Sequence, residues 1–190
     1  MSSRSEESEE KIRAFVAVEV SEQVRQSLAS IQQELKPSLK NARWTGPSAF
    51  HLTIKFLGEV SPNRIEQISN MLEGKKVSDR FTMKFVGLGV FPNPRKARVL
   101  WAGIKKGSEE LCSIFNKLEP EFEALGFEPE KRKFSGHLTL ARFKIPAQIQ
   151  PGILETEADC PECTAASLVL FKSTLKPSGA EYTPIKVFPF

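Results

Sequence analysis

The chain has 190 residues, 40% of them hydrophobic and 26% charged, a composition typical of a globular protein and not of a disordered, collagen-like or disulfide-rich chain. The formal net charge of +4 is mildly basic, which is compatible with a polyanionic partner but does not establish one. No apolar run approaches the roughly 18 residues that a membrane helix needs, and the cysteine count of three is odd. We therefore expect a cytoplasmic protein that does not bind membranes.

The first ten residues hold four glutamates and one arginine, without an apolar stretch or a cleavage site. We expect residues 1–10 to be a disordered acidic tail and not a signal peptide. Residues 11–190 are expected to fold as one domain. The sequence does not determine the oligomeric state, and one compact body makes a monomer the default expectation.

The first half of the chain alternates predicted strands and helices. Residues 12–20 are a predicted strand, and Ser21 is a suitable N-cap for a helix whose apolar residues recur at steps of four, three and four. Pro37 ends that helix. Residues 50–58 predict a second strand, and Ser61, followed by proline, predicts the start of a second helix.

The second half repeats this alternation. A third helix is predicted after Ser108, kinked or restarted at Pro120, whereas residues 146–163 show no clear pattern. Further strands are predicted within residues 81–91, 98–104, 132–143, 165–175 and 182–187. The first two of these strands form a predicted hairpin, and the whole pattern predicts an α+β fold.

The two histidines of the chain begin the same tetrapeptide. His51 opens His-Leu-Thr-Ile, and His137 opens His-Leu-Thr-Leu. A strand followed by a helix precedes each copy, which indicates an internal duplication. One histidine alone would most simply be a structural residue, but two with identical neighbours indicate a site.

Period two in a strand places each histidine and its threonine on one face. His51 and Thr53 are thus expected to share a face with Lys55. His137 and Thr139 are expected to share a face. Strict alternation places Arg142 on the opposite face, unless a β-bulge turns its side chain toward His137. Two half-chains related by a pseudo-twofold axis would bring these polar faces together across a cleft.

Two imidazoles and two hydroxyls in one cleft suit displacement at phosphorus. One neutral imidazole can remove a proton from the nucleophile, and one protonated imidazole can give a proton to the leaving oxygen. Threonine hydroxyls can donate hydrogen bonds to the non-bridging oxygens, where negative charge accumulates. No metal is required, and no acidic residue or cysteine flanks either motif at ligand spacing.

Two other features are weaker indications of function. Cys160 and Cys163 form a Cys-x-x-Cys without a second pair, which favours two free thiols over a zinc site. Trp44, Phe50 and Trp101 are aromatic residues that either stack on a base or belong to the core.

At both motifs the sequence resembles the two-histidine phosphoesterase superfamily, and within it the RNA 2′,3′-cyclic phosphodiesterases, historically called 2′-5′ RNA ligases. The resemblance extends over about residues 11–190. The segments that carry it are Arg13-Ala14-Phe15-Val16-Ala17-Val18, residues 50–60, residues 87–92, residues 99–103, residues 137–142 and residues 172–175.

This resemblance implies a bilobal α+β fold, in which two pseudo-twofold-related lobes of antiparallel sheet and helices surround a central cleft with both His-x-Thr motifs. It implies hydrolysis of RNA 2′,3′-cyclic phosphodiester ends to 2′-phosphomonoesters without a metal or another cofactor. It also implies weak, reversible 2′-5′ joining to a 5′-hydroxyl. The partner would be RNA with a cyclic phosphate end, such as a tRNA fragment or a short oligonucleotide.

The resemblance also implies residue roles. His51 would be the acid for the O3′ leaving group, His137 the base for water, and Thr53 and Thr139 would contact phosphate oxygens. The family often has Arg-x-Phe-x-Pro before the second histidine, whereas here glycine replaces the proline at position 136.

Lys55 beside the first motif and three further side chains are candidates for substrate binding. The resemblance makes Arg132 a phosphate contact and places Phe134 against a base or against the core. Arg142 either binds phosphate or packs its stem on the edge of the core.

Two alternatives to the cyclic phosphodiesterase remain at this point. A binding module for RNA ends or nucleotides would use the same cleft without turnover, although binding alone does not need two proton-transfer groups. An endoribonuclease would use the same acid and base to produce cyclic ends and not to consume them.

Overall fold

The structure is a computed structural model that describes residues 10–158, 160–177 and 179–190. The predicted acidic tail therefore falls, up to residue 9, outside the described residues. The strands are β1 (Ile12–Glu19), β2 (Ala42–Trp44), β3 (His51–Val60), β4 (Phe81–Phe91), β5 (Ala97–Lys106), β6 (His137–Ala147), β7 (Cys163–Ala165), β8 (Ser167–Lys176) and β9 (Gly179–Pro189).

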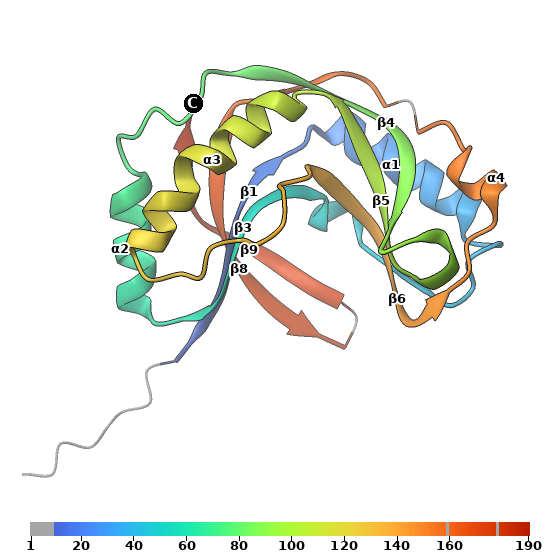
Figure 1. Ribbon diagram of the computed structural model, residues 1–190, viewed down its shortest axis with the longest axis horizontal. Helices are drawn as coiled ribbons and strands as arrows, with labels where there is room; N and C mark the ends of the chain where they lie inside the picture. Colours follow the sequence, from blue (N-terminus) through green and yellow to red (C-terminus); the bar gives the residue numbers. More distant parts are fainter. Residues whose placement is uncertain (1–9, 159, 178) are drawn as a thin grey trace, which may run out of the picture.

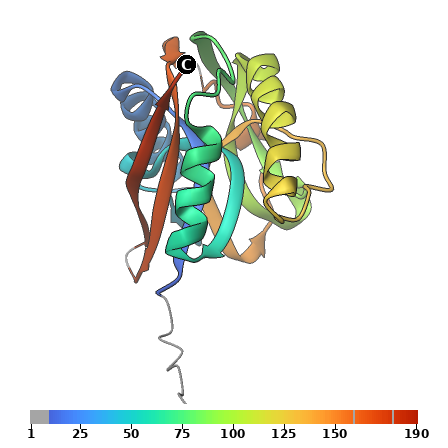
Figure 2. The ribbon, with the colours of Figure 1, turned by 90° about the vertical axis from the view of Figure 1, so that its left-hand side faces the viewer.

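These strands form one curled antiparallel sheet around which the helices lie (Figure 1). The helices are α1 (Glu22–Leu35), α2 (Pro62–Leu72), α3 (Ser108–Ala124) and α4 (Pro151–Leu154), with 3₁₀ turns η1 (Pro47–Ala49) and η2 (Pro94–Lys96). Figure 1 shows α2 and α3 at one end of the molecule and α1 and α4 at the other. Figure 2 views the end with α2, which lies between the β8–β9 pair and α3. Within the described ranges, no helix is long and apolar enough to cross a membrane.

The strand order places the two motif strands next to each other at the centre of the sheet. The order is β7-β4-β5-β6-β3-β1-β8-β9, with β2 added beside β6. Leu52 of β3 pairs with Leu138 of β6, so both His-Leu-Thr motifs meet at one point. On either side the order is equivalent, because β1 flanks β3 as β5 flanks β6. This arrangement confirms the predicted α+β fold with two related lobes.

Local sequence signals explain where the helices begin. Ser21 Oγ accepts a hydrogen bond from the Val24 amide, and Ser61 Oγ accepts one from the Arg64 amide, so both predicted N-caps are confirmed. The prediction of Ser108 as a cap is wrong. The cap is Gly107, whose φ of 90° favours glycine, and α3 continues through its proline without restarting.

The predicted hairpin of β4 and β5 is confirmed, and three short elements were not predicted. These are β2, β7 and α4, which have three or four residues each and are too short for a hydrophobic period to develop. The last two lie in or beside the stretch after residue 146 that shows no clear sequence pattern.

Each motif strand contains an extra residue directly after its His-x-Thr motif, and this residue changes which side chains share a face. In β3, Ile54 has no partner between Thr53, which pairs with Ala17, and Lys55, which pairs with Val16. In β6, Leu140 is unpaired in the same way, three residues after its histidine. Such β-bulges reverse the alternation of side chains beyond them. They therefore re-aim the residues that directly follow the two His-x-Thr motifs, among them Lys55 and Arg142.

The bulge in β3 corrects the expectation for Lys55. This lysine does not share the face of His51 and Thr53; it is buried, and its Nζ forms an ion pair with Glu119 Oε1 at 2.7 Å. The Lys55 ammonium also donates to the Glu128 carbonyl at 2.8 Å, while the same Glu119 oxygen accepts from the Glu130 amide at 2.6 Å. The pair thus ties the first motif strand to the loop that leads to the second.

Removal of one partner from this ion pair leaves a buried charge without compensation, so we expect Lys55→Ala to lower the free energy of unfolding by about 3 kcal/mol. The matched control is Lys106→Ala, which breaks the exposed pair with Glu162 and should cost only about 0.5 kcal/mol. Urea denaturation of both variants measures the difference. Equal destabilisation would mean that the buried pair adds nothing beyond a surface contact.

Candidate active site

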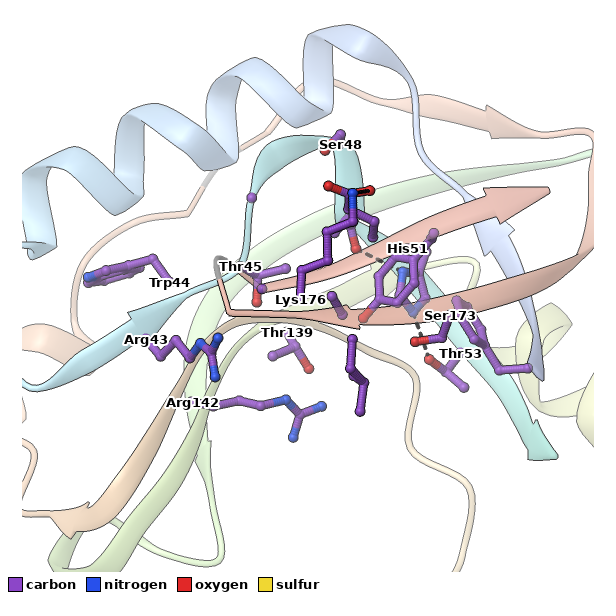
Figure 3. Close-up of a pocket in the computed structure, with 18 of the residues that line it drawn as sticks. Arg43, Trp44, Thr45, Ser48, His51, Thr53, Thr139, Arg142, Ser173 and Lys176 are labelled. Carbon is purple, nitrogen blue, oxygen red and sulfur yellow. Dashed lines mark hydrogen bonds and ion pairs between the residues drawn. The ribbon is translucent and has the colours of Figure 1, made fainter. Parts of the chain in front are cut away.

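A cavity of about 890 Å³ opens between the two motif strands and the β8–β9 hairpin (Figure 3). His51 and Thr53 of β3 line this cavity together with His137 and Thr139 of β6. The two copies of the motif, 86 positions apart in the chain, therefore present their polar side chains to the same space.

The two imidazoles are held in the same way. His51 Nδ1 lies 2.8 Å from the Ala49 carbonyl oxygen, and His137 Nδ1 lies 2.8 Å from the Ser135 carbonyl oxygen. Because a carbonyl can only accept, each Nδ1 carries the hydrogen, and Nε2 of the neutral ring is an acceptor. Thr53 Oγ1 lies 3.0 Å from His51 Nε2 and donates to it in this tautomer. Both Nε2 atoms are thus the ones available for proton transfer.

Aromatic rings surround His51 and exclude water from it. Phe15 and Tyr182 lie with ring centroids 4.7 and 4.9 Å from the imidazole, the tyrosine edge-on. Burial lowers the pKa of His51 to about 4, opposed in part by the hydrogen bond to Ala49 and reinforced by the positive charges of Arg25 and Arg142. The free protein at neutral pH therefore holds a neutral His51.

His137 occupies a related but more open place. Phe91 lies edge-on at 5.0 Å and Trp101 at 6.2 Å from its ring. Burial lowers the pKa of His137 below 6.5, with a further contribution from Arg142 and an opposing one from the Ser135 carbonyl. Both imidazoles thus favour the neutral form until an anion enters the cavity.

The cavity is lined by several cationic side chains. Arg13, Arg43, Arg142 and Lys176 all reach it, and the Lys176 ammonium pairs with Glu181 at 2.6 Å. The resulting excess of positive charge suits a phosphate or another anionic ligand.

Arg142 reaches the cavity because of the bulge in β6. Leu140, the extra residue, directs its carbonyl to the buried Gln32 of α1, whose Nε2 donates to it at 2.9 Å and to the Thr45 carbonyl at 2.8 Å. The Thr45 amide donates to the same Leu140 oxygen. A buried glutamine therefore stabilises the bulge that turns Arg142 to the side of His137.

The structure brings together five of the eight predicted site residues: His51, Thr53, His137, Thr139 and Arg142. The other three predicted residues lie elsewhere. Within the part of the chain that is described, the lining contains neither Lys55 nor Arg132 nor Phe134.

The loop before His137 explains why Arg132 and Phe134 do not line the cavity. Phe134 stacks on Phe115 of α3, with ring centroids 4.8 Å apart, so the core and not a base is its partner. Arg132 is exposed on the same loop, where its backbone amide donates to the Glu130 carboxylate.

Of the three aromatic candidates for base stacking, Trp44 lines the cavity. Phe50 is 1% exposed in the core, and Trp101 lies beside His137 without lining the space. The cavity also contains Phe56, which is 49% exposed and carries the Arg13 guanidinium 4.5 Å from its ring centroid.

Sequence reasoning missed Arg43 and Phe56. Phe56 faces the cavity because of the bulge in β3, and the sequence pattern contains no sign of that bulge. Arg43 lies on a three-residue strand without periodicity, so no signal identified it.

Metal-ligating side chains do not gather in this region. Across residues 10–158, 160–177 and 179–190, no three side chains of histidine, cysteine, aspartate or glutamate lie where they could hold a metal ion. Cys160 and Cys163 are both buried, and neither lines the cavity. Burial raises the pKa of the Cys163 thiol, which therefore stays protonated at neutral pH.

Comparison with known proteins decides the family. The model of the LigT-like phosphoesterases matches residues 18–101 and 104–182, which include both motifs. The chain belongs to this family. The predicted resemblance to two-histidine phosphoesterases is thereby confirmed.

Three similar proteins match this LigT-like phosphoesterase over nearly their whole length. An RNA 2′,3′-cyclic phosphodiesterase of Methanothermobacter thermautotrophicus is 33% identical over 185 residues, which cover 94% of this chain and 98% of the relative. A solved structure from Thermus thermophilus superposes with a TM-score of 0.80 at 27% identity, covering 94% and 97% of the two chains. Escherichia coli LigT with bound 3′-AMP has the same fold, with a TM-score of 0.79 at 23% identity, covering 95% and 99%.

The environments of the two imidazoles predict their titration. We expect ¹H–¹⁵N NMR of the free phosphoesterase to show the Nδ1–H tautomer for both histidines, with His51 protonating near pH 4 and His137 below pH 6.5. Inorganic phosphate should raise both pKa values, because its charge stabilises imidazolium and offsets the arginines. An Nε2–H tautomer, or a pKa of His51 above 6.5 without phosphate, would contradict the geometry.

Proposed function

We propose that this LigT-like phosphoesterase hydrolyses RNA 2′,3′-cyclic phosphodiester ends to 2′-phosphomonoesters by acid–base catalysis with its two histidines. The observation that carries the proposal is the pair of Nε2 atoms, from β3 and β6, which are turned into one cationic cavity. The 33% identical relative from Methanothermobacter thermautotrophicus is named an RNA 2′,3′-cyclic phosphodiesterase, which supports the same substrate class.

Displacement at phosphorus needs a base and an acid on opposite sides of the phosphate. In the proposed reaction His137 Nε2 takes a proton from water as its oxygen bonds to phosphorus. The bond from phosphorus to O3′ breaks, and protonated His51 gives its Nε2 proton to O3′. The phosphate stays on O2′. In this reaction Thr53, Thr139 and Arg142, which all line the cavity, hold the non-bridging oxygens, where charge increases in the transition state.

The substrate itself helps to prepare the acid. His51 is neutral in the free protein because burial and nearby arginines disfavour its charged form. A bound phosphodiester adds a negative charge beside both imidazoles, which favours protonation of one of them. The proposed reaction requires this proton to lie on His51 and not on His137 when the bond to O3′ breaks, although burial lowers the pKa of His51 to about 4 in the free protein.

The same geometry supports 2′-5′ ligation as a second reaction of the site. When the 5′-hydroxyl of another RNA takes the place of water, His137 removes its proton and the bond to O3′ again breaks. The new phosphodiester then joins O2′ to O5′, which gives a 2′-5′ linkage. Ligation and hydrolysis differ only in the nucleophile.

The decisive assay uses a short RNA with a 2′,3′-cyclic phosphate end, incubated in EDTA, with identification of the product. We expect a 2′-phosphate, and we expect His51→Ala and His137→Ala each to lower the rate at least ~10²-fold, because each removes a proton-transfer group. Thermal unfolding of each variant serves as the control for folding.

Other outcomes would favour other functions. Binding of the RNA without turnover would indicate a binding module, and new cyclic ends from an intact RNA would indicate an endoribonuclease. A 3′-phosphate product would reverse the acid and base assignments. Near wild-type rates for both alanine variants would mean that the histidines are structural.

The pKa shifts also predict the pH dependence. The pair holds one proton between its two apparent pKa values, the lower about 4 and the upper below 6.5. We therefore expect kcat/KM to peak in that interval, falling at lower pH as the base is protonated and at higher pH as the acid is lost. The kcat profile should lie at higher pH, since bound phosphate raises both values. A kcat/KM that rises through pH 8 would exclude this acid.

A further inference from the structure

Two arginines oppose each other on the wall of the cavity. Arg43 of β2 is the register partner of Arg142 of β6, and both side chains line the cavity. Side chains directly opposite in an antiparallel pair have Cβ atoms about 4.5–5.5 Å apart, and like charges in this position destabilise the pair. The pair therefore does not stabilise the sheet unless an anion lies between or beside the two guanidinium groups.

Within residues 10–158, 160–177 and 179–190, no carboxylate offsets this charge. Among the described residues neither arginine forms an ion pair, and the one acidic side chain in the lining, Glu181, is paired with Lys176. The hydrogen bond of Arg43 is to a neutral acceptor, the Pro177 carbonyl oxygen at the end of β8, at 2.7 Å. The guanidinium has five N–H donors in a planar fork, so donors remain for a ligand.

The position of Arg43 separates it from the reacting phosphate. Arg142 lies five residues beyond His137 on β6, about 15 Å along the strand, so its long side chain must extend back to reach the motif threonines. Arg43 stands beside Arg142 at the same level. Figure 3 shows Arg43 on the side of Arg142 that is remote from His51 and Thr53.

The size of the cavity supports a ligand larger than one nucleotide. Its volume of about 890 Å³ lies near the upper end of the roughly 300–1,000 Å³ found for small-molecule sites. One cyclic phosphate carries a single negative charge, and in the proposed reaction the histidines, the threonines and Arg142 already bind it. A second phosphate one nucleotide away would supply the anion that Arg43 lacks.

We propose that Arg43 binds the phosphodiester that precedes the cyclic end, so that the site prefers an oligonucleotide end to a nucleoside 2′,3′-cyclic phosphate. The inference rests on the proposed function and adds the substrate's length to it. A planar guanidinium recognises phosphate by paired hydrogen bonds, which makes Arg43 a specificity residue and not a proton-transfer group.

The test compares two substrates: adenosine 2′,3′-cyclic phosphate with a free 5′-hydroxyl, and the same nucleotide carrying a 5′-methyl phosphate diester. The two differ by the phosphodiester alone. We expect wild type to have the higher kcat/KM for the second substrate, and Arg43→Gln to lower the ratio of the two values about tenfold at low salt. Arg43→Lys should restore part of the ratio, since lysine keeps the charge without the fork.

The matched control is Arg98→Gln. Arg98 is an exposed arginine on β5 that also donates to a backbone carbonyl, that of Lys144, but it does not line the cavity. The Arg98→Gln variant loses the same charge and the same kind of hydrogen bond, and we expect its substrate ratio to equal that of wild type.

Salt provides a second readout. Salt screens the attraction between a guanidinium and a phosphodiester, so such a contact steepens the fall of kcat/KM as the salt concentration rises. We expect this extra slope for the phosphodiester substrate with wild type and with Arg98→Gln, and its loss with Arg43→Gln.

The outcomes separate the two proposals. An equal loss on both substrates in Arg43→Gln would mean that Arg43 holds the β8–β9 hairpin through Pro177, and would overturn the specificity role. An unchanged ratio would overturn it as well. Hydrolysis of neither substrate by wild type would instead refute the proposed function itself.

Discussion

The two β-bulges at the centre of the sheet are the constraint on which the site depends. Without an extra residue in β3 and in β6, strict alternation would direct Arg142 into the core and Lys55 into the cavity. With Ile54 and Leu140 unpaired, each strand presents its histidine and threonine on one face and then changes face within two residues. The central strands therefore contribute both to a continuous apolar core and to a polar cavity.

A bulge breaks ladder hydrogen bonds, and the fold compensates for this with groups distant in sequence. The carbonyl of Leu140 receives hydrogen bonds from the buried Gln32 side chain and from the Thr45 amide. A buried glutamine with one missing partner would cost about 1–3 kcal/mol. The partners of Gln32 thus tie α1 and the segment after β2 to the second motif strand, which fixes the wall that carries Arg43.

Periodicity and capping made most of the fold predictable. Ser21 and Ser61 mark helix starts because their hydroxyls satisfy amides that the helix leaves free, and this depends only on local sequence. The His-Leu-Thr repeat likewise located the four side chains at the centre of the site. The burial of the Lys55 side chain was not predictable, because the bulge and the ion pair with Glu119 depend on packing between segments that are distant in the sequence. Phe134 deviates for the same reason, because Phe115 of α3 supplies the stacking partner.

The two His-x-Thr motifs are alike at their histidines and differ farther along their strands. His51 and His137 each place Nδ1 against the carbonyl two residues before them, so each half turns one Nε2 toward the cavity. Five residues beyond each histidine the halves differ, because β3 has Phe56 where β6 has Arg142. One side of the cavity therefore presents an exposed ring, and the other a cation beside Arg43. A nucleotide has the same division into a flat base and a charged backbone, so this asymmetry can orient the ligand that the symmetric groups would bind in either direction.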